Sequence, residues 1–171
     1  TKAEFDVYSQ DYKHLVNQSV NFSGLTVDFF TQGKANFINR ILEEGQAYKI
    51  LDVGCGIGEI HPFITKSQRV ITGVDVSKES LEIARKNYPS HTYEIYDGYT
   101  LPFENSIFDV ALTICVMHHV KPSEWQHFVN EMVRVVKPGG WIFIVEHNPY
   151  NPLTRLAVNR CPFDKDAVLL R

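Results

Sequence analysis

Glycines at alternating positions follow an apolar stretch that is typical of a buried strand. Residues 51–58 read Leu-Asp-Val-Gly-Cys-Gly-Ile-Gly, and an amphipathic stretch comes next. Glycine adopts a positive φ readily and lets a ligand approach the main chain closely. The helix expected behind the loop offers unpaired N–H groups at its amino end. This spacing predicts a loop that binds a nucleotide-type cofactor.

Polar and nucleophilic residues follow the expected strands at one edge of the predicted sheet. They are Asp52, Asp75, Asp97, Cys115–His119 and Glu146–His147. In an open parallel sheet, ligands bind outside the carboxyl ends of the strands, where the strand order reverses. A carboxylate in the place of Asp75, after the second strand, suits the ribose hydroxyls of NAD or of any other adenosine ligand.

The dinucleotide fingerprint Gly-x-Gly-x-x-Gly fits only in part. Gly54 and Gly56 match, but Glu59 occupies the third position and the third glycine is Gly58. A glutamate at the start of the helix would repel a pyrophosphate, which normally sits at the positive end of the helix dipole. A cationic cofactor without phosphate would not be repelled. Glu59 therefore argues against an NAD-dependent oxidoreductase, which stays as an alternative because Asp75 also suits NAD.

The apolar patterns predict strands that alternate with helices. We expect helices at 26–43, 57–66, 77–88, 123–136 and 152–159, and strands at 49–53, 70–76, 91–96, 108–116 and 141–145. Ser77 is an expected helix cap, Ser123 with Gln126 an expected capping box, and residues 137–140 an expected turn. The alternation predicts a Rossmann-like, doubly wound α/β fold with a mostly parallel sheet in the order 3-2-1-4-5 and helices on both faces.

Successive motifs resemble those of class I S-adenosylmethionine-dependent methyltransferases, and in particular the UbiE-like, or methyltransferase type 11, group. They are Asp52–Gly58, Val74–Ser77, Tyr96–Gly98, Phe108–Val110 and Val136–Gly140. The resemblance extends over residues 48–147. It implies in-line transfer of the sulfonium methyl group to a small-molecule, lipid or glycan acceptor. A binding module that holds S-adenosylmethionine without catalysis is a further alternative.

The resemblance also implies which residues bind the cofactor. It places Asp52 near the amino group of the methionine part, Asp75 on the ribose hydroxyls, and Asp97 on the adenine amino group. Cys115 would line the pocket near the sulfonium, and Tyr12 would close over the methionine end. The full set is Tyr12, Asp52, Gly54, Cys55, Gly56, Gly58, Asp75, Val76, Asp97, Gly98 and Cys115.

Methyl transfer needs a general base only if the acceptor carries a proton that must leave early. His119 and His118, just past the fourth strand, are the catalytic candidates, followed by Glu146 and His147 past the fifth. Histidines at such a junction also serve as local hydrogen-bonding or packing residues, and that interpretation stays open.

The chain has 171 residues, which predicts one domain over residues 1–171. Within it we expect a helical lid at 1–46, a cofactor-binding core at 47–147 and an incomplete C-terminal extension at 148–171. The resembled family usually adds an antiparallel hairpin after the fifth strand, and the sequence lacks it. We therefore expect a fragment or a truncated fold.

Composition limits the function classes further. The net charge is −3 (17 basic and 20 acidic residues) with no basic run, which disfavours extended nucleic-acid binding. No apolar stretch approaches the ~20 residues of a membrane span. The cysteines Cys55, Cys115 and Cys161 lie far apart, which predicts a reducing, cytoplasmic location and no structural zinc or other metal. The oligomeric state is left open.

Overall fold

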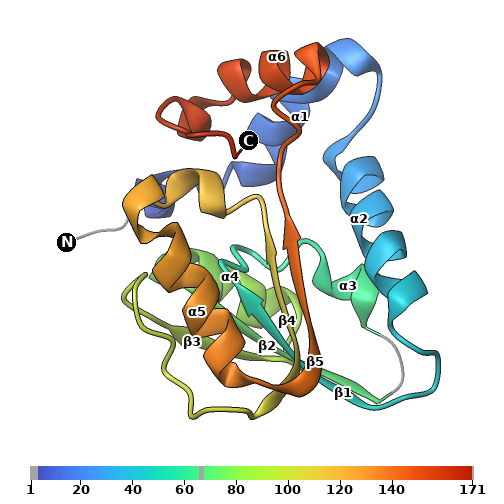
Figure 1. Cartoon of the computed structure of the whole chain (residues 1–171). Helices are drawn as coiled ribbons and strands as arrows, with labels where there is room; N and C mark the ends of the chain where they lie inside the picture. The colour runs from blue at the N-terminus through green and yellow to red at the C-terminus, as the bar shows by residue number, and fades with distance from the viewer. Residues whose placement is uncertain (1–3, 66–67, 171) are drawn as a thin grey trace.

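The computed structural model describes residues 4–65 and 68–170. Its strands form a five-stranded parallel sheet in the order β3-β2-β1-β4-β5 (Figure 1). The strands are β1 (Tyr48–Val53), β2 (Arg69–Asp75), β3 (Thr92–Ile95), β4 (Phe108–Ile114) and β5 (Val136–Val145). The predicted order is confirmed. It reverses between β1 and β4, so a ligand crevice belongs at the carboxyl ends of these two strands.

Helices cover both faces of the sheet, as predicted. On one face, α2 (Val27–Ile41) and α3 (His61–Ile64) pack on apolar residues of β1, β2 and β4. On this face α4 (Lys78–Asn87) packs against Tyr93 of β3, whose hydroxyl lies 2.9 Å from Nδ1 of His61. The other face is covered by α5 (Trp125–Val135), which buries Phe128, Met132 and Val135. Their spacing of three to four residues forms one apolar stripe along the helix.

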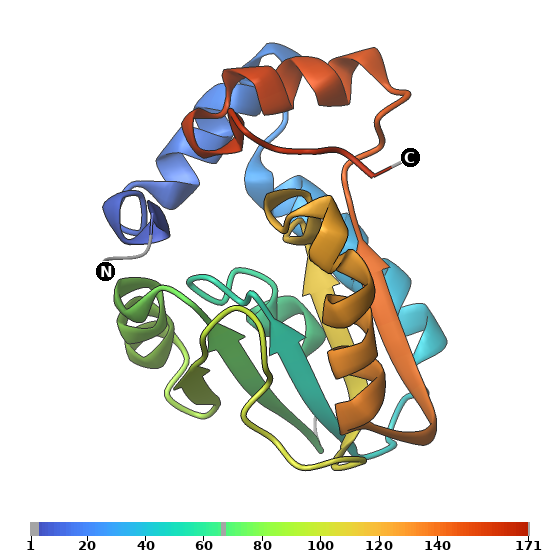
Figure 2. The same ribbon diagram turned by 60° about the vertical axis from the view of Figure 1, so that its left-hand side comes forward.

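The chain ends come together above the carboxyl edge of the sheet. There α1 (Tyr12–Val20) lies beside α6 (Pro152–Arg160) (Figure 2). The ring of Tyr12 stacks on Phe163 of the short helix η5 (Pro162–Asp164), with ring centroids 5.3 Å apart. The N–H of Val168 donates to the carbonyl of His118, 2.9 Å away. These contacts bring residues 4–20 and 152–170 over the strand ends.

The helix predicted at 57–66 is much shorter in the structure. Tight turns follow the glycines, with Gly58 N–H bonded to the Cys55 carbonyl and His61 N–H to the Gly58 carbonyl. The helix α3 therefore begins only at His61, with Pro62 in its first turn. It ends at Ile64 because Thr65 is extended, and residue 66 lies outside the described residues.

Two predictions around α5 are wrong. Ser123 does not cap the helix, because Pro122–Glu124 forms a separate 3-10 turn, η4, and the N-cap Glu124 makes no side-chain cap bond. The Gln126 side chain bonds Asn130 instead. Residues 137–140 are counted within β5 rather than as a turn before it. Their register against β4 shifts between Phe108 and Val110, so this stretch bulges.

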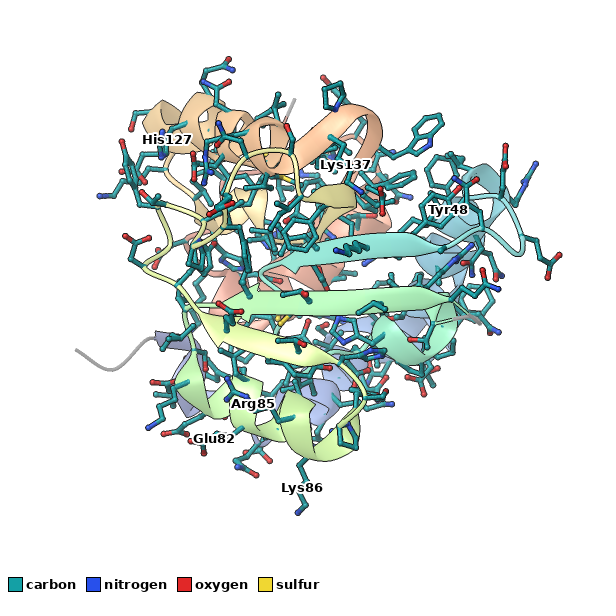
Figure 3. All side chains as sticks on the ribbon, turned by 90° about the horizontal axis from the view of Figure 1, so that it is seen from below. Tyr48, Glu82, Arg85, Lys86, His127 and Lys137 are labelled. Atoms are coloured by element: carbon teal, nitrogen blue, oxygen red, sulfur yellow. The ribbon has the colours of Figure 1, made fainter. Side chains whose placement is uncertain are left out.

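The amino-terminal edge of the sheet carries its own polar contacts. Asp109 accepts from Nζ of Lys137 at 2.6 Å and from the backbone N–H of Lys49 at 2.8 Å. Figure 3 shows this underside, with Tyr48 at the start of β1. A surface depression of about 310 Å³ opens here, lined in part by Tyr48, Asp109, Lys137 and Trp141. It lies at the wrong end of the strands for a ligand site of this fold.

Among the described residues, none of the helices is long and apolar enough to pass through a lipid bilayer.

Candidate active site

The glycine loop after β1 takes the conformation that the sequence predicts. Gly54, Gly56 and Gly58 have φ of 75°, 52° and 79°. A Cβ on Gly54 would lie 2.5 Å from the Val116 side chain, and one on Gly58 would lie 2.9 Å from the His61 ring. A Cβ on Gly56 would meet nothing within 4 Å. Packing therefore requires glycine at the outer two positions, whereas Gly56 presents its backbone to open space.

Asp75 joins the end of β2 to this loop. Its Oδ2 accepts the N–H of Gly56 and its Oδ1 accepts the N–H of Ser77, both at 2.8 Å. The residue is only 8% exposed. Burial raises the pKa of Asp75, although the N–H groups of Ser77 and Gly56 act to lower it. The structure thus brings together the two features that the sequence assigns to the cofactor.

Asp52 lies beneath the loop rather than on its surface. Its Oδ2 accepts from Nε2 of His61 at 2.9 Å, and Tyr93 lies at the other ring nitrogen. Asp52 is 2% exposed and His61 is fully buried. This hydrogen-bonded chain supports the turn from below. His61 has no signal in the sequence motifs, because only the short α3 places it under the glycines.

The residues after β2 and β3 lie on the other side of the expected ligand crevice. Val76 is 37% exposed there, and a Cβ on Gly98 would lie 3.1 Å from its side chain. The Oδ1 of Asp97 accepts the N–H groups of Thr100 and Tyr99, each at 2.8 Å. These two bonds lower the pKa of Asp97 below its ordinary value. Asp97 therefore fixes the turn that follows β3, directly before Gly98 in the chain.

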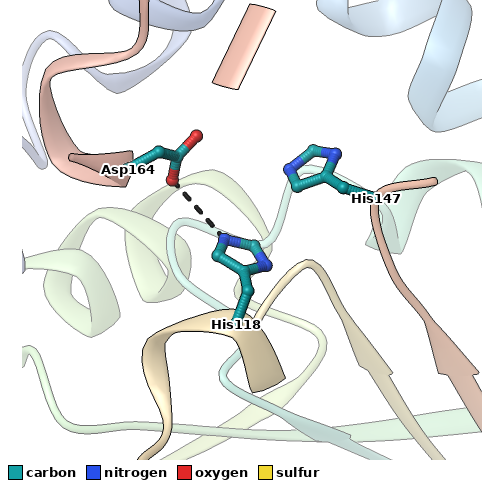
Figure 4. Close-up of side chains that lie close together, drawn as sticks. All are labelled: His118, His147 and Asp164. Atoms are coloured by element: carbon teal, nitrogen blue, oxygen red, sulfur yellow. Dashed lines mark ion pairs between the residues drawn. The ribbon is translucent and has the colours of Figure 1, made fainter. Parts of the chain in front are cut away.

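A cluster of histidines and carboxylates follows β4 and β5. Glu146 accepts the N–H groups of Val116 and Met117, and its Oε2 accepts from Nδ1 of His118 at 2.7 Å. The Oδ1 of Asp164 lies 3.5 Å from Nε2 of His118. The ring of His147 is 4.9 Å from that of His118, centroid to centroid (Figure 4). Residues far apart in the sequence thus surround one buried imidazole.

The electrostatics of this cluster differ between its histidines. Burial lowers the pKa of His118, but the nearby carboxylates of Asp164 and Glu146 outweigh burial and raise the pKa to about 9. Burial and the His118 charge lower the pKa of His147 to about 4. The His118 contacts hold the pKa of Asp164 well below its usual range, against the effect of burial. At neutral pH His118 therefore carries a proton and His147 does not.

The candidate bases His118 and His119 lie close together, as their sequence positions predict, but they differ in their ability to accept a proton. A protonated His118 between two carboxylates has no nitrogen ready to accept a proton. His119 is more accessible, and its Nε2 lies 3.3 Å from Oδ1 of Asp164. His119 as base stays a prediction. Asp164 itself escapes sequence analysis, because no motif marks a residue that lies 46 positions after His118.

Cys115 and Tyr12, two further predicted residues, also lie near the carboxyl ends of the strands. Cys115 directly follows β4 and has a φ of 57°, and Nζ of Lys34 on α2 lies 3.1 Å from its sulfur. Tyr12 packs on Phe163, and burial together with nearby Cys115 and Asp164 strongly raises the pKa of its hydroxyl. Sequence analysis misses Lys34, because an exposed-looking lysine in a helix carries no pattern of its own.

Comparisons with known proteins show which family this chain resembles in sequence. A family model described as a methyltransferase domain matches residues 51–144. An uncharacterized methyltransferase of Synechocystis is 33% identical over 114 residues, which cover 66% of this chain and 53% of the relative. A demethylmenaquinone methyltransferase of Tropheryma whipplei is 34% identical over 101 residues, which cover 57% and 41%.

A solved structure of similar fold also belongs to a methyltransferase. A crystal structure of a SAM-dependent methyltransferase from Methanosarcina mazei is 28% identical, with a TM-score of 0.61 over 70% of this chain and 61% of that one. The chain spans about half or less of the length of the two curated relatives (53% and 41%). These comparisons give no support to an NAD-dependent oxidoreductase.

Proposed function

The chain belongs to the methyltransferase domain family of class I S-adenosylmethionine-dependent methyltransferases, and on this premise we propose that the protein methylates a small-molecule or lipid acceptor. One observation carries the proposal. The buried carboxylate of Asp75 is bonded to Gly56 at the point where the strand order reverses. A carboxylate in this place binds ribose hydroxyls, and the open backbone beside it admits the rest of the cofactor.

The residues of the crevice fit S-adenosylmethionine in shape and in charge. Gly56 leaves room above the loop, and exposed Val76 offers an apolar surface for a flat ring. Asp75 and Glu59 supply negative charge near the loop, which favours a cation and disfavours a pyrophosphate. The Oε2 of Glu59 lies 3.7 Å from Nζ of Lys13. When bound, the cofactor supplies a methyl group that its sulfonium already activates.

The work left to the protein is orientation and exclusion of water. Alignment of two reactants contributes roughly 7–11 kcal/mol in favourable cases. We assign the covering role to Tyr12 and Phe163, whose stacked rings lie over the strand ends. Cys115 and Lys34 line the side toward β4. His119 is the proposed base for an acceptor that must lose a proton, with Asp164 holding its ring.

The acceptor class follows from charge and from the relatives. A net charge of −3 without a basic run favours a small acceptor over a long nucleic acid. One relative is named a demethylmenaquinone methyltransferase, and another a phthiotriol/phenolphthiotriol dimycocerosates methyltransferase. We therefore propose a small organic molecule or a lipid as the acceptor.

The deciding experiment combines binding and product analysis. The chain is incubated with S-adenosylmethionine that carries an isotope-labelled methyl group and with a panel of quinols, phenols, amines and lipids. We expect binding by calorimetry, a labelled product by mass spectrometry, and inhibition by S-adenosylhomocysteine. The proposal fails if the cofactor does not bind at high micromolar concentration. Binding without product on any acceptor favours the non-catalytic module, and NADH binding by fluorescence favours the oxidoreductase.

A further inference from the structure

We propose that His118, His147 and Asp164 bind a divalent transition-metal ion beside the acceptor side of the crevice. The sequence predicts no metal, because these residues come from three separate segments after β4, after β5 and from η5. In the fold, their ligand atoms all lie within 4.8 Å of one another (Figure 4).

The spacing of the ligand atoms fits an ion. Metal–ligand bonds to nitrogen and oxygen measure about 2.0–2.2 Å, so two ligands of a tetrahedral ion lie roughly 3.3–3.6 Å apart. Nε2 of His118 and Oδ1 of Asp164 are 3.5 Å apart. The nitrogen of His147 is at most 4.8 Å from the others, and a side-chain movement of roughly 1 Å brings it into the same range.

Nε2 of His118 is the second observation that points to a ligand. The side chain is 1% exposed. Among the described residues, its Nε2 is a buried side-chain polar atom without a hydrogen-bond partner, and Oδ1 of Asp164 faces it at ion-pair distance. Buried polar atoms are rarely left unsatisfied, because desolvation without a bond costs about 1–3 kcal/mol. A metal ion at this position satisfies the nitrogen and neutralises the carboxylate.

Glu146 supplies the outer support that such a site needs. Histidine ligands of metals usually donate their other ring N–H to a carboxylate, which fixes the tautomer and the ring orientation. Glu146 accepts from Nδ1 of His118 at 2.7 Å and is itself held by the N–H groups of Val116 and Met117. Without an ion, Nε2 carries a proton at neutral pH. An ion that binds there displaces this proton and takes the Nε2 lone pair, with Oδ1 of Asp164 3.5 Å from that nitrogen.

The donor set selects the type of ion. Two imidazoles and one carboxylate suit Zn²⁺, Co²⁺ or Fe²⁺ better than Mg²⁺ or Ca²⁺, which prefer oxygen ligands. Three protein ligands leave a position for water or for an oxygen of the acceptor. Binding of an acceptor oxygen to the ion rests on the proposed function, whereas binding of the ion itself does not.

The test uses the full chain after treatment with a chelator, without S-adenosylmethionine or acceptor. Zn²⁺ is titrated by calorimetry, and Co²⁺ is titrated by visible absorption. We expect one ion per chain and a cobalt spectrum of nitrogen and oxygen ligands. His147→Gln and Asp164→Asn each weaken binding at least tenfold. His14→Gln, on exposed α1, leaves binding unchanged and serves as the matched control.

Several results would overturn the metal site. One is the absence of stoichiometric binding at high micromolar Zn²⁺ or Co²⁺, in which case His118 is simply a cation between two carboxylates. Another is a thiolate-to-cobalt band, which would assign the ion to Cys161 or another cysteine. Equal affinity in wild type and His147→Gln would also contradict it. Circular dichroism checks that each variant is folded. If Asp164→Asn unfolds, the His147→Gln variant decides the test, because His147 is only half-buried. Because no cofactor is present, failure here leaves methyl transfer untouched.

Discussion

At the scale of single residues, the glycine loop separates what folding requires from what binding requires. Gly54 and Gly58 are in contact with Val116 and His61, so a larger residue there disturbs packing. Gly56 shares their positive φ but faces open space. A methyl group at Gly56 therefore changes the crevice more than the fold.

Gly56→Ala tests this distinction. An alanine at positive φ costs roughly 1–2 kcal/mol of stability, and we expect about this loss in urea unfolding. The added methyl enters the space assigned to the cofactor, so the affinity for S-adenosylhomocysteine should fall at least tenfold by calorimetry. The matched control is Gly139→Ala, which has a φ of 81° and open space at the opposite edge of the sheet. Equal affinity in both variants would remove the loop from the cofactor site.

At the scale of elements, Ser77 connects α4 to the start of the chain. Its Oγ accepts the N–H of Ser80 at 3.1 Å and donates to Oδ1 of Asp6 at 2.6 Å. The sequence predicts the cap but not the second bond, because Asp6 lies 71 positions earlier. One buried hydroxyl therefore stabilises a helix and anchors the N-terminal segment.

We predict that Ser77→Ala destabilises the protein by about 2–3 kcal/mol. A lost cap accounts for about 1 kcal/mol. The lost hydrogen bond to the buried Asp6 carboxylate, which also accepts the N–H of Glu79 at 3.4 Å, accounts for about 1–2 kcal/mol more. Asn151→Ala is the comparison, since the Asn151 side chain caps the exposed start of α6 by accepting the N–H groups of Leu153 and Thr154. It should cost about 1 kcal/mol. Urea unfolding measures both, and equal losses would contradict the anchoring role.

Glu131 gives a prediction about pH. Hydrogen bonds from Arg134 lower the pKa of Glu131. Burial acts against them, and the N–H of Leu101 lowers the pKa further. The folded pKa lies below the ordinary value of 4.5. The group therefore stabilises the fold above that pH, and this stability is lost as pH falls through the folded pKa. Glu131→Gln should be about 1 kcal/mol less stable at pH 7.

The difference between Glu131→Gln and wild type should disappear as the pH falls well below 4.5, because wild type is then protonated too. Thermal unfolding across pH measures this convergence. Glu82→Gln, on the exposed side of α4 (labelled in Figure 3), should differ little from wild type at every pH. A constant gap for Glu131→Gln across pH would contradict the assignment.

The sequence predicts most elements because burial repeats along each of them. The apolar run of β4 and the stripe of Phe128, Met132 and Val135 on α5 are visible without a structure. The turns are less visible, since Pro122 and the bulge at 137–140 depend on contacts with neighbouring segments. The site residues at strand ends are predicted because the position of each strand places them. His61, Lys34 and Asp164 are not predicted, because they reach the site only through contacts between segments.

At the scale of the whole molecule, the two chain ends hold each other above the sheet. Tyr8 and Tyr12 both pack on Phe163, with ring centroids 5.7 and 5.3 Å away. Asp164, next to Phe163, contacts His118 and His119. The covering segments and the histidine cluster are therefore connected through η5.

Phe163→Ala should loosen the cover without unfolding the core. The lost ring contacts are worth about 0.5–1.5 kcal/mol each beyond the buried area. We expect faster hydrogen exchange in Tyr12–Val20 and unchanged exchange in β1. Phe103→Ala, which removes a ring from the opposite core, provides the contrast, since it should not affect α1. Unchanged exchange in α1 of the Phe163 variant would mean that the chain ends are held independently.

The most direct test measures the affinity for S-adenosylmethionine by calorimetry in wild type, Asp75→Ala and Asp109→Ala. Both acids adjoin strands, but Asp75 lies at the crevice and Asp109 at the opposite edge, bonded to Lys137. Our account predicts one bound cofactor in wild type, at least tenfold weaker binding in Asp75→Ala, and unchanged binding in Asp109→Ala. No binding to wild type, or equal binding in Asp75→Ala, would contradict it.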